Sequence, residues 1–296
     1  MHGSLISVKP KPMFKTILFF FAAFLMLSCA SVTSTQTTKE SVTIDPDFES
    51  SDSSVALYTI PLSSKSFATD KLNQLYLITE QNEIIKYDSK GKEVFRYNNN
   101  FLENLSHVDA TDPFNLLLYY PDYLSVITLD RTMNKTGEFD LSSLNLIRVK
   151  AVGSSNDNQV WLYDEVGFQL KKINRSGDVL RQSVDLNLQL NYPPKPIFLI
   201  EKENSIYVND PAYGILIFNV FGEYESMIEL KGINTFQIFD NRLLYKKGQE
   251  VFSYHLQTFD QRAIKLPVEL KDSDEILIQK NRLFVRKTDR IEVYTL

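Results

Sequence analysis

The chain repeats one pattern of apolar and polar positions along most of its length. Residues 76–97, YLITEQNEIIKYDSKGKEVFRY, read as three short apolar strands separated by a polar break and a glycine turn. Similar segments lie at 116–141, 160–186, 206–230 and 243–266, and a copy at 283–296 ends after its second strand. Another short apolar stretch precedes each copy, as at 66–69 and 235–239. The pattern therefore predicts six units of four strands.

The spacing of these units indicates the architecture. The second strand of each copy ends at one of six positions about 40 residues apart: Asp88, Asp130, Asn174, Asn219, His255 and Thr295. A period near 40 residues, built from short strands, is typical of a β-propeller. We therefore predict an all-β, six-bladed propeller of four-stranded antiparallel blades. Five or seven blades stay open at this stage, because the fifth unit is short.

The two ends of the repeat region predict how the ring closes. The last unit lacks a strand, whereas residues 55–60 alternate as a strand should and have no unit of their own. We expect this N-terminal strand to complete the last blade, which would cover an otherwise exposed sheet edge. No amphipathic helix is expected between residues 54 and 296. The proline-rich residues 191–196 are expected to form an extended connector, and a short docking motif is the alternative.

Several units resemble NHL-type six-bladed propellers. The resemblance is strongest in 67–97 and 206–224, where Tyr207-Val208-Asn209-Asp210, Ile217-Phe218-Asn219 and Gly222 follow the order of the family's blade. Tyr87, Asp88 and Gly91 match it too, as do Tyr163, Asp164, Asn174 and Gly177. The resemblance covers about residues 54–296 and implies the propeller fold. Because this architecture serves enzymes, sensors and scaffolds, it implies no single function.

The start of the chain predicts an export signal and a lipid anchor. Lysines at 9, 11 and 15 precede an apolar run over 17–27, which is shorter than the roughly 20 residues of a membrane-spanning helix. Met26-Leu27-Ser28-Cys29 resembles a bacterial lipobox, which implies acylation of Cys29, the single cysteine. The alternative is a plain signal peptide, and translation could start at Met1 or Met13.

The resulting domain prediction has three parts. Residues 1–28 are a lipoprotein signal peptide, residues 29–53 are the acylated cysteine with a flexible Ser- and Thr-rich tether, and residues 54–296 are the propeller. Because no Asp follows Cys29, the resemblance implies the periplasmic face of an outer membrane. Membrane contact is expected through the lipid alone. The net charge of −5 argues against non-specific binding of nucleic acid.

The sequence offers little recognisable chemistry. The predicted mature chain has two histidines, His107 and His255, in different blades, and closely spaced metal ligands are missing. Carboxylates that could serve a metal-dependent hydrolase or lactonase at the channel mouth are Asp122, Asp164, Glu165 and Asp210. We expect them to be solvated, and we therefore expect no catalytic activity, no metal and no cofactor.

The connections between the second and third strands carry the candidate partner-binding residues. They should open on one face of the ring, with acids and tyrosines on one side and cations on the other. The candidates are Tyr120, Asp122, Tyr123, Asp164, Glu165, Asp210, Tyr213, Lys246, Lys247, Arg286 and Lys287. Tyrosines beside charges are typical of protein interfaces, although charged loop tips can also serve solubility alone.

These features of the sequence favour a lipid-anchored protein-interaction module. We expect it to be an accessory subunit of an envelope secretion or outer-membrane biogenesis assembly. One alternative is a sensor that binds a glycan or peptide in the channel mouth, with Trp161, Tyr163, Tyr120 and Tyr213 as stacking surfaces. A metal-dependent hydrolase is the other.

Overall fold

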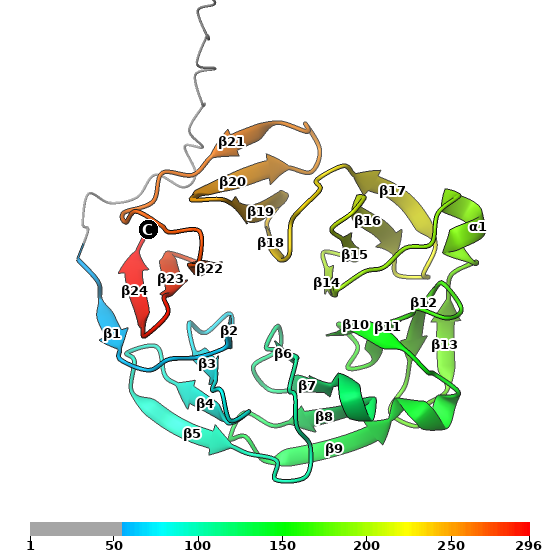
Figure 1. Cartoon of the computed structure of the whole chain (residues 1–296), viewed down its shortest axis with the longest axis horizontal. Helices are drawn as coiled ribbons and strands as arrows, with labels where there is room; N and C mark the ends of the chain where they lie inside the picture. Colours follow the sequence, from blue (N-terminus) through cyan, green and yellow to red (C-terminus); the bar gives the residue numbers. More distant parts are fainter. Residues whose placement is uncertain (1–54) are drawn as a thin grey trace, which may run out of the picture. The chain divides into compact units, whose positions relative to one another are not determined.

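The computed structural model describes residues 55–296, which form six four-stranded antiparallel sheets arranged as a ring (Figure 1). In five of the sheets the strands follow chain order from the axis outwards, and the sixth runs β22-β23-β24-β1, so that β2, β6, β10, β14, β18 and β22 face the centre. The prediction of a six-bladed propeller is confirmed, and five or seven blades are excluded.

The strand bounds define the blades. Blade 1 contains β2 (Ser66–Thr69), β3 (Leu75–Ile78), β4 (Ile84–Tyr87) and β5 (Glu93–Tyr97). Blade 2 contains β6 (His107–Asp109), β7 (Leu116–Tyr120), β8 (Ser125–Leu129) and β9 (Lys135–Asp140). Blade 3 contains β10 (Val149–Ser154), β11 (Val160–Asp164), β12 (Gln169–Ile173) and β13 (Val179–Gln182).

Blades 4 to 6 complete the ring. Blade 4 contains β14 (Phe198–Lys202), β15 (Ser205–Asp210), β16 (Gly214–Asn219) and β17 (Tyr224–Ile228). Blade 5 contains β18 (Phe236–Phe239), β19 (Arg242–Lys247), β20 (Glu250–His255) and β21 (Gln261–Ala263). Blade 6 contains β22 (Glu275–Gln279), β23 (Arg282–Arg286), β24 (Ile291–Thr295) and β1 (Tyr58–Ile60).

The N-terminal strand closes the ring as the sequence predicts. β1 pairs antiparallel with β24, with Tyr58 opposite Val293 and Ile60 opposite Ile291. The last sheet therefore joins the first and last described strands of the chain, and β24 does not present an unpaired edge.

In blades 1 to 4, the turn that follows the third strand is stabilised by the Asp or Asn residue that marks the repeat in the sequence. Oδ1 of Asp88 accepts hydrogen bonds from the backbone N–H groups of Lys90 and Lys92, both at 2.9 Å. Asp130, Asn174 and Asn219 accept the same pair of bonds in blades 2 to 4. Their short side chains replace part of the backbone pairing in a tight turn.

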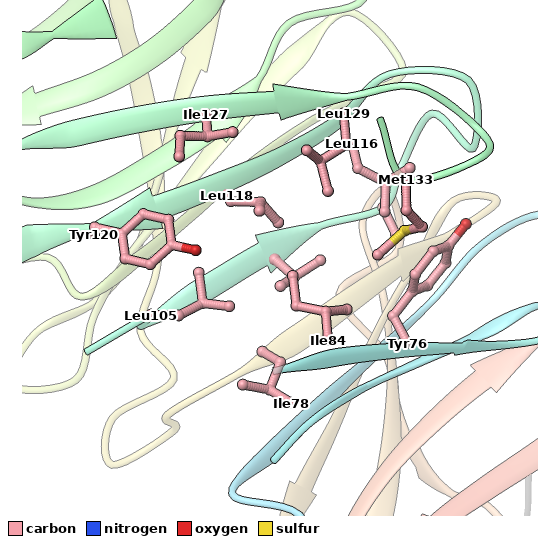
Figure 2. Close-up of a cluster of buried hydrophobic side chains, with 12 residues drawn as sticks. Tyr76, Ile78, Ile84, Leu105, Leu116, Leu118, Tyr120, Ile127, Leu129 and Met133 are labelled. Carbon is pink, nitrogen blue, oxygen red and sulfur yellow. The ribbon is translucent and has the colours of Figure 1, made fainter. Parts of the chain in front are cut away.

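The core lies between neighbouring blades, so both faces of most sheets are buried. Figure 2 shows the cluster between blades 1 and 2, where Tyr76, Ile78 and Ile84 meet Leu116, Leu118 and Ile127. Each of these side chains is nearly inaccessible to solvent. At about 25 cal/mol per Å² of buried apolar surface, such clusters are the main source of stability.

Buried polar side chains also connect the blades. Glu201 of blade 4 accepts hydrogen bonds from Ser155 Oγ and Trp161 Nε1 of blade 3, each at 2.5 Å. The amide of Asn209 in β15 donates to two carbonyls in the connection that leads into blade 5. These bonds satisfy groups that would otherwise be costly to bury.

One short helix accompanies the strands, and it is too short to be the amphipathic helix whose absence the sequence predicts. This helix, α1 (Leu186–Leu190), lies between β13 and β14, and Asp185 caps it by accepting from the N–H groups of Asn187 and Leu188. Five residues with one buried leucine are too short to give a periodic signal. The 3-10 helices at Pro121–Tyr123 and Leu141–Leu144 are shorter still. The proline-rich connector after α1 has no regular structure, as predicted.

The export signal, Cys29 and the tether lie outside the described residues. None of the helices within 55–296 is long and apolar enough to cross a bilayer.

Candidate functional site

The topology sorts the connections onto two faces of the ring. In each blade the first-to-second and third-to-fourth connections open at one end, which we call the turn face. The second-to-third connections and the blade-to-blade connections open at the other end, which we call the inter-blade face. All predicted partner-binding residues belong to, or border, connections on the inter-blade face.

Three of the predicted partner-binding residues are buried, which corrects their assignment to the surface. Tyr120 is fully buried in the core shown in Figure 2. Asp164 accepts hydrogen bonds from the N–H groups of Val166 and Gly167. Asp210 accepts them from Ala212 and Lys195. These two carboxylates shape their loops and are not presented to a partner.

Asp164 also forms an ion pair inside its own blade. Its Oδ2 lies 2.7 Å from Nζ of Lys171, and both side chains are largely buried. Burial raises the pKa of Asp164, but the hydrogen bonds from Lys171 and from the loop N–H groups together lower it by more. The carboxyl pKa therefore lies below its usual value. The group therefore stays ionised and paired at neutral pH, which suits a structural role.

The predicted cationic side of the face is mostly paired. Arg286 lies 2.6 Å from Glu275 and also donates to the carbonyl of Ser64. Lys287 lies 3.4 Å from Glu292, and Lys246 donates to the carbonyl of Asp272. Lys247 is exposed, whereas the other three cations are partly buried. The face therefore has less free positive charge than the sequence suggests.

The remaining predicted residues lie on blades 2 to 4. Asp122 and Tyr123 are exposed, and Asp122 accepts a hydrogen bond from Asn104 in the preceding connection. The Glu165 side chain is largely buried between Arg148, at 3.7 Å, and Lys150, at 3.8 Å. Tyr213 stacks on Tyr192 with ring centroids 3.6 Å apart. For these four residues, partner binding stays a prediction.

The structure also reveals an apolar set that the repeat pattern does not reveal. Six consecutive connections on the inter-blade face, from β5–β6 to β15–β16, each expose a large apolar or aromatic side chain. We call these residues the apolar patch: Phe101, Tyr123, Ile147, Val166, Ile197 and Tyr213, with exposed fractions from 36% to 88%. The long β13–β14 connection exposes Val184 and Leu188 as well.

The other half of the inter-blade face differs in character. Among the described residues, the six connections from β17–β18 round to β3–β4 expose no large hydrophobic side chain. Phe101, Tyr123, Ile147 and Ile197 each stand next to an apolar residue that packs in or against the core (Leu102, Leu124, Leu146 and Phe198), so the sequence does not distinguish the exposed residue from the buried one. The signal that could identify them is a second apolar residue in a connection, beyond the one that packs against the core.

A cavity of about 310 Å³ occupies the centre of the ring. Side chains from the inner strands of five blades line it, including Phe67, His107, Phe198 and Phe236. His107 packs edge-on against Phe198 at 5.7 Å, and Phe198 packs edge-on against Phe236 at 5.3 Å. These contacts place aromatic groups from blades 2, 4 and 5 around one end of the channel.

Neither ligand prediction based on the sequence matches this cavity. Trp161 and Tyr163 are fully buried between blades, as is Tyr120, so they cannot stack on a glycan. The carboxylates expected at a hydrolase mouth, Asp122, Asp164, Glu165 and Asp210, do not line the cavity. Across residues 55–296, no three His, Cys, Asp or Glu side chains come together in a group that could hold a metal ion.

Comparison with known proteins gives likeness in fold only. No protein-family model and no curated protein matches the sequence. Virginiamycin B lyase from Staphylococcus aureus, a catalytically inactive histidine-to-alanine variant with quinupristin, superposes with a TM-score of 0.58 at 11% identity, over 81% of this chain and 99% of that chain.

Two other propellers are similar to the same degree. The Swd1 β-propeller domain from Myceliophteria thermophila gives a TM-score of 0.55 at 10% identity, over 82% of this chain and 99% of that one. The WD40 domain of Pan2 from Neurospora crassa gives 0.53 at 10% identity, over 78% and 81%.

These structures correct the expectation that the chain has no catalytic activity. That expectation took the lack of a recognisable motif as grounds to exclude an enzyme, but a lyase is similar to this chain in fold. At 11% identity the likeness transfers neither a reaction nor a residue to this chain.

Proposed function

We propose that this chain is a protein-interaction module that binds its partner through the apolar patch on the inter-blade face. The observation that carries the proposal is the run of six consecutive connections with an exposed large apolar side chain. Isolated apolar residues are normal on a protein surface, whereas a set that gathers on one face favours an interface. The propeller fold suits this role because a rigid ring presents many loops on one side.

The charges beside the patch suggest the chemistry of the partner. Arg148 and Lys150 flank Ile147, and their side chains are 66% and 58% exposed although each approaches Glu165. Both cationic head groups face solvent as well as the largely buried Glu165 carboxylate, so each can also reach an acceptor on a partner. The partner that fits is a protein surface with apolar side chains and a carboxylate placed opposite Arg148.

Substitutions in the patch test the interface without disturbing the core. Ile147→Glu with Val166→Glu should abolish co-purification of the partner from the native envelope, because both side chains are exposed and charge opposes burial of the patch. The matched control is Phe221→Glu with Phe259→Glu, which changes two exposed aromatic residues on the turn face. Equal loss of the partner in both variants, or in neither, contradicts the assignment.

The module is, in our proposal, held at the periplasmic face of an outer membrane by a lipid on Cys29. The lipobox-like Met26-Leu27-Ser28-Cys29 and the Ser- and Thr-rich segment after it support this location. Such a tether would let the ring act as an accessory subunit of an envelope secretion or outer-membrane biogenesis assembly.

Metabolic labelling tests the anchor. Cells fed an alkyne fatty acid should label the native chain, and Cys29→Ala should remove both the label and the membrane association. A Cys29→Ala chain that stays labelled would contradict lipid attachment at this residue.

A further inference from the structure

The central cavity has two chemically different ends. The inner strands all begin at the inter-blade face and end at the turn face. Lining residues at the start of these strands therefore lie at one end, and those at or after the strand ends lie at the other. The lining residues therefore differ in chemical character from one end of the axis to the other.

The end near the inter-blade face combines aromatic side chains with the polar residues Ser66, Ser106, Thr235 and Glu275. Phe67, Phe198 and Phe236 occupy the first two positions of β2, β14 and β18, and His107 is the first residue of β6. Burial lowers the pKa of His107, so its imidazole is uncharged at neutral pH and adds a flat, neutral ring to this end. Such a floor favours a flat or aliphatic apolar body.

The end near the turn face is cationic. Lys71 lies in the β2–β3 connection and Lys202 ends β14, and both line the cavity. Among residues 55–296, neither lysine has a carboxylate within ion-pair distance. Lys71 is exposed, so this end of the cavity is open to solvent.

Two acids also line the cavity, and neither forms an ion pair with Lys71 or Lys202. Asp109 ends β6 at the turn face, where it accepts hydrogen bonds from the N–H groups of Thr111 and Ser154, at 2.9 and 2.7 Å, and keeps its charge. Glu275 is paired with Arg286 at the other end of the cavity. An anionic group at the turn-face end would therefore meet two lysines and one carboxylate, which leaves a net positive charge.

We propose that the central cavity binds a small amphipathic anion, with its apolar body toward Phe198 and Phe236 and its anionic head toward Lys71 and Lys202. The volume of about 310 Å³ lies at the lower end of the roughly 300–1,000 Å³ typical of small-molecule sites, which limits the body to one or two rings or a short acyl chain. A carboxylate, sulfonate or phosphate head meets the same requirement. This site is separate from the apolar patch and independent of partner binding.

Two probes of nearly equal shape test the charge requirement. 2-Naphthoate and neutral 2-naphthylmethanol are titrated into the full-length chain in lipid nanodiscs, with empty nanodiscs as the blank, and binding is followed by ligand-observed NMR. Native protein should bind 2-naphthoate on the order of tenfold more tightly, since a charge-assisted contact to lysine distinguishes the probes. Equal affinity for both probes, or binding of neither, overturns the proposal.

Variants locate the site within the cavity. Lys71→Ala with Lys202→Ala should remove the preference for 2-naphthoate and leave the weaker binding of 2-naphthylmethanol. Lys90→Ala with Lys92→Ala, which changes two exposed lysines at the outer β4–β5 turn on the same face, should retain the preference. A preference that survives the first pair, or is lost with the second, overturns the assignment.

The aromatic end has its own test. Phe198→Trp should fill the cavity and weaken both probes at least tenfold, with the unfolding temperature measured to establish that the ring is intact. Should that variant unfold, the two lysine pairs still decide the question. Unchanged binding in a folded Phe198→Trp variant contradicts a site in the channel.

Discussion

Asn209 offers a sharp test of how buried polar groups hold the blades together. Its side chain is fully buried, and Nδ2 donates hydrogen bonds to the carbonyls of Ile233 at 2.8 Å and Asn234 at 3.0 Å. No hydrogen-bond donor from the described residues reaches its Oδ1. Asn209→Asp keeps the shape of the side chain but replaces the donor by a carboxylate oxygen that faces two carbonyls.

The magnitude follows from these contacts. Two lost hydrogen bonds cost about 1 kcal/mol each, and a buried carboxylate without a partner adds roughly 3 kcal/mol. We therefore expect the free energy of unfolding to fall by about 5 kcal/mol at pH 7. Because burial raises the pKa of the introduced carboxyl above its unfolded value, the variant is least impaired below that unfolded pKa and loses stability as pH rises through the folded pKa.

Urea unfolding followed by circular dichroism at pH 7 and at pH 4.5 measures the effect, each variant being compared with the native chain at the same pH. Asn219→Asp is the control: it lies in an exposed turn where blades 1 and 2 already have Asp88 and Asp130. Its one side-chain partner, Glu223, is exposed, so solvent screens the new pair of carboxylates and stability should change by no more than about 1 kcal/mol. An Asn209→Asp chain as stable as the control at pH 7 would refute the reasoning, as would a loss that does not shrink at pH 4.5.

Two further predictions concern backbone geometry and protonation. Gly214→Ala should destabilise the ring far more than Gly232→Ala. A Cβ at Gly214 would lie 2.2 Å from the carbonyl oxygen of Ile228, whereas a Cβ at Gly232 would meet no atom within 4 Å. Thermal unfolding measures the difference, and similar unfolding temperatures for the two variants would contradict the prediction. Burial lowers the pKa of His107 despite the opposing charge of Asp109, so the stability that depends on a neutral His107 is present above pH 6.5 and lost as pH falls below it. His107→Gln should make the free energy of unfolding less dependent on pH between 5 and 7 in urea titrations, and an unchanged dependence would count against it.

The fold could be predicted from the sequence because its information is local and repeated. Blades 1 to 4 are each marked by a turn residue such as Asp88 or Asn219, whose side chain bonds the following backbone at the same point of the blade. Because the last unit lacks one strand and the N-terminal strand has no unit of its own, the sequence also predicts the pairing of β1 with β24. The helix α1 could not be predicted, because five residues are too few to show a helical period of apolar positions.

The candidate site was harder to predict because burial depends on neighbours that are distant in sequence. Tyr120 ends a strand beside a polar connection, but its side chain packs into the core between blades 1 and 2. Asp164 and Asp210 read as free acids, although backbone N–H groups of their own loops already bind them. Ion pairs such as Arg286 with Glu275 depend on strand register, which periodicity alone does not specify.

The apolar patch illustrates the opposite case. Residues such as Ile147 and Val166 lie exposed in connections between strands, and only the ring topology shows that these connections lie on one face. The sequence shows apolar residues in these connections, but their shared direction follows from the closed fold.

Site-specific photo-crosslinking in living cells tests the central claim most directly. A benzophenone amino acid is placed in the full-length chain at Ile147 or Val166 on the inter-blade face, and at Phe221 or Phe259 on the turn face. The account predicts that both patch positions crosslink to the same protein and that neither turn-face position does. Crosslinks to that protein from the turn face alone, or equally from both faces, would contradict binding through the apolar patch.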